Sequence, residues 1–147
     1  MTSQQTKTTN KGKKNSNIRI LVVEDDLITT FITSSFLKKH YNFDSVTSGY
    51  AALNALEENN YDVILMDINL GDLNMDGIKT MRQIRMDKKH RDSKIIAVTG
   101  FANNEKWYVN QGFDALFLKP LEEDKIVGWI NKYAEKKLDE SCVPELA

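Results

Sequence analysis

Short apolar runs alternate along this chain with segments in which apolar residues recur at helical spacing. Four strong runs cover residues 18–23, 61–66, 94–99 and 113–118, and a weaker run covers 43–47. Runs of this length, rich in β-branched residues, are typical of strands that are buried on both faces of a parallel sheet. The segments between them favour amphipathic helices. The pattern therefore predicts five strands that alternate with five helices.

Polar residues mark where these helices begin and end. Asp26, Ser48 and Asp76 stand in the position of an N-cap before helices predicted over residues 27–39, 49–58 and 77–86. Two more helices are predicted over 103–111 and 122–136, and Gly112 ends the first of these. In the first helix, the spacing predicts a stripe that faces the core, made of Leu27, Ile28, Phe31, Ile32 and Phe36.

Alternating strands and helices imply a parallel sheet with helices on both faces. The runs at 18–23 and 61–66 are the most apolar, so we place them in the centre of the sheet. Strand order 2-1-3-4-5 satisfies this, which gives an α/β fold of the flavodoxin-like, doubly wound (βα)5 class. We expect one folded domain over residues 17–137, a disordered polar tail over 1–16 and a flexible C-terminal tail over 138–147.

Composition narrows the class of protein. The 147 residues carry a formal net charge of −1, so no strong field favours nucleic acid or an anionic membrane as a direct partner. No apolar run approaches the roughly 20 residues of a membrane-spanning helix, and the N-terminus has no secretory signal. Cys142 is the only cysteine, which fits a cytoplasmic protein without an internal disulfide. His40 and His90 lie among lysines without metal-ligand spacing and are predicted on the surface.

Carboxylates gather where two neighbouring central strands end. Glu24 and Asp25 follow the first strand, and Asp67 follows the third. Each like-charge pair near 4 Å costs on the order of 1 kcal/mol in water and roughly 4 kcal/mol at an effective dielectric of 20. A hard divalent cation removes this conflict, so we expect Mg²⁺, with Mn²⁺ as an alternative. The predicted ligands are Asp25, Asp67, the backbone carbonyl of Asn69 and, through water, Glu24.

Two more polar residues end the fourth and fifth strands. Thr99 supplies a hydroxyl and Lys119 a positive charge beside the carboxylates. A carboxylate nucleophile, a metal, a lysine and a hydroxyl are the parts that phosphoryl transfer uses. The sequence therefore predicts Asp67 as a phosphoacceptor, with Thr99 and Lys119 binding the transferred oxygens.

Five short motifs in this order resemble the response-regulator receiver domain, the CheY-like family of two-component signalling. They are residues Val22 to Asp26, Leu65 to Asp67, Met75 to Gly77, Val98 to Gly100 and Leu118 to Pro120. The resemblance spans about residues 17–136. It implies that Asp67 takes phosphate from a sensor histidine kinase or a histidine phosphotransfer protein, and that the Lys119–Pro120 bond is cis. It also implies an output partner that binds the face of helix four, strand five and helix five.

The sequence departs from the family pattern at three places. The loop between Asp67 and Gly77 is about two residues longer and lacks a proline. Leu116 stands where the family often has an aromatic residue, with Phe117 next to it. Phe101, two residues after Thr99, is a bulky group near the expected path of water, so we expect it to slow hydrolysis of the acyl phosphate.

Three other functions were weighed against a signalling switch that catalyses only its own phosphorylation and dephosphorylation. An aspartate phosphatase of the haloacid dehalogenase type would need an acid at residue 69, where this chain has an asparagine. A flavin module would need a Ser/Thr/Gly-rich phosphate loop where Glu24, Asp25 and Asp26 stand. A non-phosphorylated interaction domain would be favoured if the aspartate, the lysine or the acid pair were missing. The switch is the function that we expect.

Overall fold

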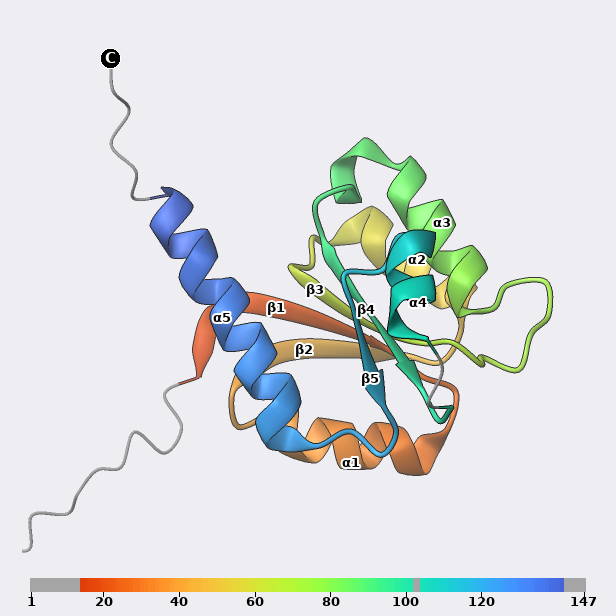
Figure 1. Ribbon diagram of the computed structural model, residues 1–147, viewed down its shortest axis with the longest axis horizontal. Coiled ribbons are helices and arrows are strands. Elements are labelled where there is room, and N and C mark those ends of the chain that lie inside the picture. The colour runs from red at the N-terminus through yellow and green to blue at the C-terminus, as the bar shows by residue number, and fades with distance from the viewer. Residues whose placement is uncertain (1–13, 102–103, 142–147) are drawn as a thin grey trace, which may run out of the picture.

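The computed structural model describes residues 14–101 and 104–141, and its sheet confirms the predicted topology. Five parallel strands pair in the order β2-β1-β3-β4-β5 (Figure 1). The strands are β1 (Asn15–Val23), β2 (Tyr41–Val46), β3 (Val63–Asp67), β4 (Lys94–Thr99) and β5 (Ala115–Leu118). The helices are α1 (Leu27–Leu37), α2 (Gly49–Glu58), α3 (Gly77–Met86), the short 3-10 helix η1 (Lys88–His90), α4 (Glu105–Gln111) and α5 (Glu123–Ser141).

The ends of the domain extend further than the sequence pattern predicted. Strand β1 begins at Asn15, so residues 15 and 16 belong to the sheet. Helix α5 continues to Ser141 instead of ending near residue 136. Of the tails predicted over residues 1–16 and 138–147, residues 1–13 and 142–147, which include Cys142, lie outside the described residues.

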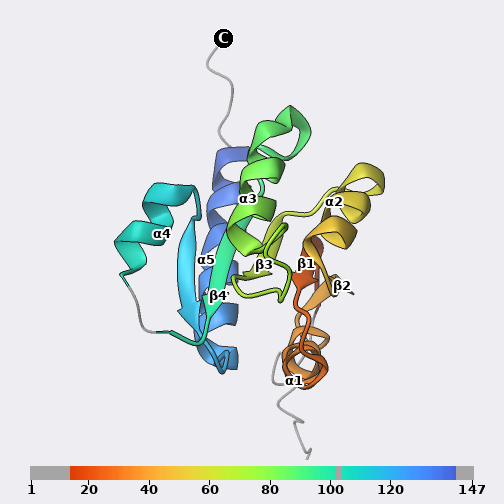
Figure 2. The same ribbon diagram turned by 90° about the vertical axis from the view of Figure 1, so that its right-hand side faces the viewer.

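Helices cover both faces of the sheet, and each face has its own apolar core (Figures 1 and 2). On one face, α1 and α5 contribute buried residues that include Phe36, Leu37, Ile126 and Ile130. The other core lies beneath α2, α3 and α4, with buried residues that include Ala52, Leu56, Met81, Ile84 and Tyr108. Strand β3 is buried along its whole length, as its unbroken apolar run predicted.

The predicted core face of α1 is wrong. Leu27 and Phe31 are 75% and 76% exposed, and Ile28 and Ile32 also lie on the surface. Only Phe36 of the predicted stripe is buried, together with Thr33 and Leu37. The reason is that α1 turns a face containing threonines toward the molecule, so its most hydrophobic face is left in solvent.

The prediction that His90 lies on the surface is also wrong, because its side chain is buried. Its Nε2 lies 2.7 Å from the carbonyl oxygen of Leu56, and Lys89 Nζ lies 3.2 Å from that of Glu57. Helix α2 has no basic residue in its last turn. The short helix η1 therefore supplies polar groups to the C-terminal carbonyls of α2, which would otherwise lack partners.

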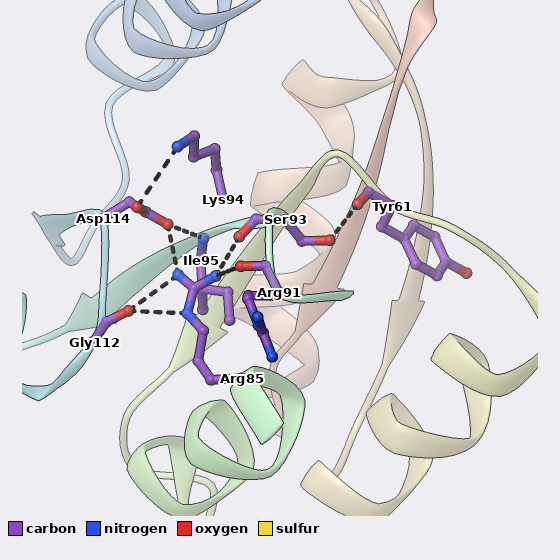
Figure 3. A network of polar contacts seen from close by, with 8 residues as sticks. All are labelled: Tyr61, Arg85, Arg91, Ser93, Lys94, Ile95, Gly112 and Asp114. Atoms are coloured by element: carbon purple, nitrogen blue, oxygen red, sulfur yellow. Dashed lines mark hydrogen bonds and ion pairs between the residues drawn. The ribbon is translucent and has the colours of Figure 1, made fainter. Parts of the chain in front are cut away.

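Arg85 near the end of α3 contacts several segments that are far apart in the sequence (Figure 3). Its guanidinium donates twice to the carbonyl of Gly112, the residue that ends α4, at 3.0 and 3.1 Å. It also lies 2.7 Å from Asp114 Oδ2, which accepts a hydrogen bond from the backbone N–H of Ile95. Two further carbonyls, of Arg91 and Ser93, accept from the same side chain. One residue thus joins α3, the end of α4 and the starts of β4 and β5.

Candidate functional site

The predicted site residues converge at the edge where the strands end, which faces the viewer in Figure 2. Asp67 and Thr99 are the last residues of β3 and β4. Glu24 and Asp25 directly follow β1, and Lys119 directly follows β5. The parallel register places these positions together, since Val23 pairs with Met66 and Thr99 pairs with Leu118.

Lys119 forms the electrostatic centre of the site. Its Nζ lies 2.6 Å from Glu24 Oε1 and 3.2 Å from Asp67 Oδ1. The backbone holds this side chain in place, because the Lys119 N–H donates to the carbonyl of Thr99 at 2.8 Å. The Lys119–Pro120 bond is cis, as the family resemblance implied. The sequence predicted that Lys119 lies beside the carboxylates, and its closest contact there is with Glu24.

The three carboxylates are arranged in a way that suits a divalent cation. One oxygen from each of Glu24, Asp25 and Asp67 lies within 4.8 Å of the other two. Glu24 and Asp67 are buried, whereas Asp25 is exposed at the mouth of the crevice. Both oxygens of Glu24 are buried, and the carboxylate makes no aligned hydrogen bond among the described residues, although Oε1 lies against Lys119 Nζ. A buried carboxylate with one ammonium contact and two acidic neighbours is a group that a hard cation would stabilise, so these residues fit Mg²⁺.

The charge on Asp67 is opposed by its surroundings. Burial raises the pKa of its carboxyl group to about 7, and the neighbouring Glu24 adds to this rise. Lys119 acts in the opposite direction but does not cancel the effect. Burial lowers the pKa of Lys119 itself, yet its contacts with Glu24 and Asp67 outweigh burial and leave that pKa raised. Lys119 therefore stays charged. A second positive charge would stabilise the ionised forms of Glu24 and Asp67 further.

The loop that follows β3 carries Asn69 and closes against α3. The N–H of Asn69 donates to Asp67 Oδ1 at 3.1 Å, which orients the carboxylate. Gly77 begins α3 so close to β3 that an added Cβ would lie 2.2 Å from the carbonyl oxygen of Asp67. A residue larger than glycine would push Asp67 out of place, which explains the glycine after Asp76 better than helix capping alone. Asp76 is the N-cap, as predicted, and accepts from the N–H of Lys79 at 2.8 Å.

A cavity of about 410 Å³ opens next to the site, with Ile68 and Asn69, the two residues after Asp67, in its lining. Thr99 is nearly buried in its wall, and the Thr99 hydroxyl oxygen accepts a long hydrogen bond of 3.3 Å from the N–H of Phe101. The other lining residues come from the loop after β3 and from the segment after β4, and they are Ile68, Asn69, Gly71, Asp72, Leu73, Asp76, Phe101 and Tyr108. The two most exposed apolar groups of this set are Leu73, at 87%, and Phe101, at 69%.

Sequence reasoning missed Leu73 and Tyr108 as neighbours of the site. Leu73 lies in an irregular loop, where the pattern of apolar residues gives no direction to a side chain. Tyr108 is on α4, and its nearly buried ring packs edge-on against Trp107 and Phe113. The only sequence signal near Leu73 was the extra length of the loop between Asp67 and Gly77. That length does not show where the side chains of the loop lie.

None of the helices in the described part of the chain is long and apolar enough to span a membrane.

Two comparisons connect the chain to proteins of known kind. It is 30% identical over 122 residues to the transcription factor SKN7 of Saccharomyces cerevisiae, which covers 81% of this chain and 19% of that protein. It is also 30% identical over 126 residues to the aerobic respiration control sensor protein ArcB of Escherichia coli K12, covering 84% and 16%. The chain therefore spans less than a fifth of these relatives.

Solved structures share the fold. The receiver domain of the sensor histidine kinase PA1611 from Pseudomonas aeruginosa, solved with magnesium coordinated in its active-site cleft, has a TM-score of 0.70 and 28% identity, covering 78% of this chain and 95% of that one. A CheY-like receiver domain from Methylobacillus flagellatus has the same TM-score and identity, covering 78% and 97%. The family model of the response regulator receiver domain matches residues 20–131. This match agrees with the acidic crevice, with Lys119 and with the strand order. The chain therefore belongs to the response regulator receiver domain family.

Proposed function

We propose that this chain is a phosphoacceptor of a two-component phosphorelay, in which Asp67 receives a phosphoryl group from a phosphohistidine and partner binding changes as a result. The observation that carries the proposal is the grouping of Asp67 with Glu24 and Asp25 and with the Lys119 ammonium, whose Nζ lies 3.2 Å from Asp67 Oδ1. These are the groups that hold a cation and the oxygens of a transferred phosphoryl group.

In the proposed reaction, a carboxylate oxygen of Asp67 attacks phosphorus in line with the P–N bond of the donor. The O–P bond forms as the P–N bond breaks, and its electron pair returns to the imidazole nitrogen. Lys119 lies where its charge can stabilise the phosphoryl oxygens. The Thr99 hydroxyl can donate to one of the same oxygens, since its hydrogen is free while its oxygen accepts from Phe101 N–H.

The proposed metal is Mg²⁺, with Mn²⁺ as an alternative of similar ligand preference. Asp25, Asp67 and the carbonyl of Asn69 would hold it directly, and Glu24 through water. The bound cation supplies charge that neutralises the carboxylates and the transferred oxygens. The magnesium in the cleft of the related PA1611 receiver domain supports this assignment.

Incubation with acetyl phosphate and Mg²⁺, followed by intact mass measurement, tests the proposal. We expect the mass of one phosphate to be added to the wild-type chain and none to Asp67→Asn. Asp92→Asn is a suitable control, because Asp92 is an exposed acid outside the site. A wild-type chain that takes up no phosphate from acetyl phosphate or from a phosphoimidazole donor would contradict the proposal.

We also propose that the chain is a switch, not an enzyme that acts on other molecules. Asn69 stands where a phosphatase of the haloacid dehalogenase type has its general acid, and an amide cannot supply a titratable proton. The expected chemistry is one phosphorylation of Asp67 per cycle and its slow hydrolysis. Steady turnover of a phosphate ester by the purified chain would favour the phosphatase instead.

Two exposed apolar surfaces are candidates for the partners of such a switch. The α1 surface consists of Leu27, Ile28, Phe31 and Ile32, and it directly follows Asp25 and Asp26 at the mouth of the site. Because it is continuous with the acceptor, we assign it to the protein that carries the phosphohistidine, a sensor histidine kinase or a histidine phosphotransfer protein. Such a partner would place the proposed reaction in the cytoplasm, where the lone cysteine would stay reduced.

The second surface lies on the other side of the site. Its exposed apolar residues are Trp107 and Val109 on α4 and Leu118 on β5. We assign this α4–β5–α5 surface to the downstream protein partner. The aromatic ring of this set, Trp107, packs against Tyr108, which lines the cavity together with Thr99, so the surface adjoins the wall of that cavity.

A further inference from the structure

Another cavity, of about 440 Å³, opens at the edge of the sheet where the strands begin, opposite the edge that carries the acidic site. Lys94 is the first residue of β4 and Asp114 directly precedes β5, whereas Asp67 and Thr99 end their strands. The proposed phosphoryl transfer uses no residue of this cavity. Helix α5 supplies the rest of its lining, which consists of Trp129, Lys132, Tyr133, Glu135, Lys136 and Asp139.

Two aromatic rings form part of the wall of this cavity. Trp129 and Tyr133 stack on each other, with ring centroids 6.3 Å apart and an angle of 22° between the rings. Both side chains are half-buried and pack against the core shared by α1 and α5, so the fold holds the rings in place. Part of their remaining surface lines the cavity. Rings fixed in this way offer a flat ligand a contact surface at little cost in side-chain entropy.

Lysines stand on both sides of the aromatic pair. Lys132 follows Trp129 by three residues and Lys136 follows Tyr133 by three, so each lysine lies next to a ring on the surface of α5. From β4, Lys94 Nζ lies 5.9 Å from the centroid of the Tyr133 ring. Within the part of the chain that the structure describes, neither lysine of α5 forms an ion pair. Their charges are therefore available to an anionic ligand.

Asp114, a carboxylate of the lining, is already paired. Its Oδ2 lies 2.7 Å from Arg85 Nη2 and accepts the N–H of Ile95 at 2.8 Å (Figure 3). Its Oδ1 is 3.9 Å from Lys94 Nζ, a distance at which the lysine can turn toward a ligand without breaking a short hydrogen bond. The negative charge of Asp114 is thus largely compensated by Arg85.

The other two carboxylates of the lining lie further round α5. Glu135 follows Lys132 by three residues and Asp139 follows Lys136 by three, so the lysines lie between these acids and the rings. A small ligand on the rings would contact the lysines before the acids. A long polyanion laid along α5 would also pass the acids, which disfavours a nucleic acid strand.

We propose that this cavity binds a mononucleotide, with its base on the Trp129–Tyr133 pair and its phosphate held by the lysines that flank the rings. Bases stack on aromatic side chains whatever their identity, and a phosphate monoester carries a charge near −2 that suits several ammonium groups better than a single carboxylate would. The cavity volume falls within the range of roughly 300–1,000 Å³ that is usual for small-molecule sites. The inference is independent of the proposed function of Asp67.

Tryptophan fluorescence tests the inference directly. Trp107 and Trp129 are the two tryptophans of the chain, so Trp107→Phe leaves only the one that lines the cavity. We would titrate this variant with AMP and with CMP in EDTA, which keeps divalent cations from carrying phosphate to the acidic site. We expect a saturable change with a Kd below about 1 mM. Adenosine and inorganic phosphate, which each carry half of the ligand, should bind at least about tenfold more weakly.

Substitutions on α5 then locate the ligand. Lys132→Gln combined with Lys136→Gln should raise the Kd for AMP about tenfold, as expected from the loss of two charge-assisted contacts that solvent screens in part. The control is Lys38→Gln combined with Lys106→Gln, which removes the same charge at two exposed lysines outside the cavity and should leave the Kd unchanged. Tyr133→Leu should also raise the Kd about tenfold, whereas Tyr133→Phe should keep it.

Three results would overturn the inference. The first is the absence of a saturable change with both AMP and CMP. The second is a Kd that is the same in the variant lacking Lys132 and Lys136 as in its control, which would place the nucleotide elsewhere. The third is a single-stranded oligonucleotide that binds at least about tenfold more tightly than AMP, which would assign the cavity to nucleic acid.

Discussion

Among the single residues, Asp67 is a carboxyl group whose ionised form is disfavoured by its surroundings. Burial and the nearby Glu24 raise its pKa to about 7, and only Lys119 offsets them. In the unfolded chain the same group has a pKa near 3.8. Between these two pH values the folded state binds more protons than the unfolded state, so this group makes the folded chain less stable as the pH rises. The site is therefore a destabilising feature in the absence of a cation.

Asp67→Asn should stabilise the metal-free chain at alkaline pH. The gain should be about 1–2 kcal/mol at pH 8, less than the full shift implies because the variant also loses the ion pair with Lys119, and it should vanish near pH 4, where Asp67 is protonated in the folded state. Urea unfolding in EDTA at both pH values measures it. Asp92→Asn should show no such pH dependence. A wild-type chain that equals Asp67→Asn in stability at pH 8 would contradict the prediction.

Magnesium should reverse this order of stabilities. A ligand that binds only the folded state adds RT ln(1 + [L]/Kd), which is about 2.7 kcal/mol at a hundredfold excess over Kd. The wild type should therefore gain stability in Mg²⁺ at pH 8, and Asp67→Asn should gain much less. Equal gains by both chains would show that the ion binds elsewhere.

Phe101 is predicted to protect the phosphorylated form. Its exposed ring lies at the mouth of the cavity next to Thr99, where water would reach an acyl phosphate. Phe101→Ala should shorten the lifetime of phosphorylated Asp67 by about two- to fivefold, the equivalent of about 0.4 to 1 kcal/mol in the barrier. Decay of the phosphorylated mass after removal of the donor gives this lifetime, and Phe101→Leu is the control of similar bulk. A lifetime unchanged in Phe101→Ala would reject this role.

At the scale of elements, the strands were predictable and some helix surfaces were not. Apolar runs with polar ends gave the order of the strands and the convergence of Glu24, Asp67 and Lys119, because a parallel sheet brings all its carboxyl ends to one edge. The buried face of α1 was not predictable from hydrophobicity, since the helix buries Thr33 and exposes Phe31. The burial of His90 depends on η1 packing against the end of α2, a contact between segments that no local pattern encodes.

Arg85 illustrates how such contacts between elements are held. Arg85→Ala should destabilise the chain by about 2–3 kcal/mol, because it removes a charge-assisted bond to Asp114 and leaves several carbonyls without a donor. Arg82→Ala on the same helix is the matched control, since its side-chain hydrogen bond to Gln111 is exposed, and it should cost at most about 0.5 kcal/mol. Urea unfolding compares the two. Similar losses for both variants would show that the Arg85 network adds little.

At the scale of the whole molecule, the acceptor lies between two exposed apolar surfaces with different neighbours. The α1 surface adjoins the acids that precede it, while the α4–β5–α5 surface packs through Tyr108 against the cavity. Soluble proteins seldom leave several large apolar side chains together in solvent unless a partner covers them. Two such surfaces on one small domain would suit the proposed relay, in which the donor and the target bind at different places.

Charged substitutions should distinguish the roles of the two surfaces in binding the donor. Phe31→Asp on α1 should lower the rate of phosphotransfer from a phosphohistidine-bearing protein about tenfold or more, because it buries a carboxylate against an apolar partner. The same variant should accept phosphate from acetyl phosphate at the wild-type rate, since Phe31 lies outside the acceptor site. Val109→Asp on α4 is the matched substitution and should leave both rates unchanged. All four rates, for two variants with two donors, are measured by quenching the reactions at intervals and determining the intact mass of the chain. Loss of protein-donor transfer in Val109→Asp but not in Phe31→Asp would assign the donor to the α4–β5–α5 surface instead.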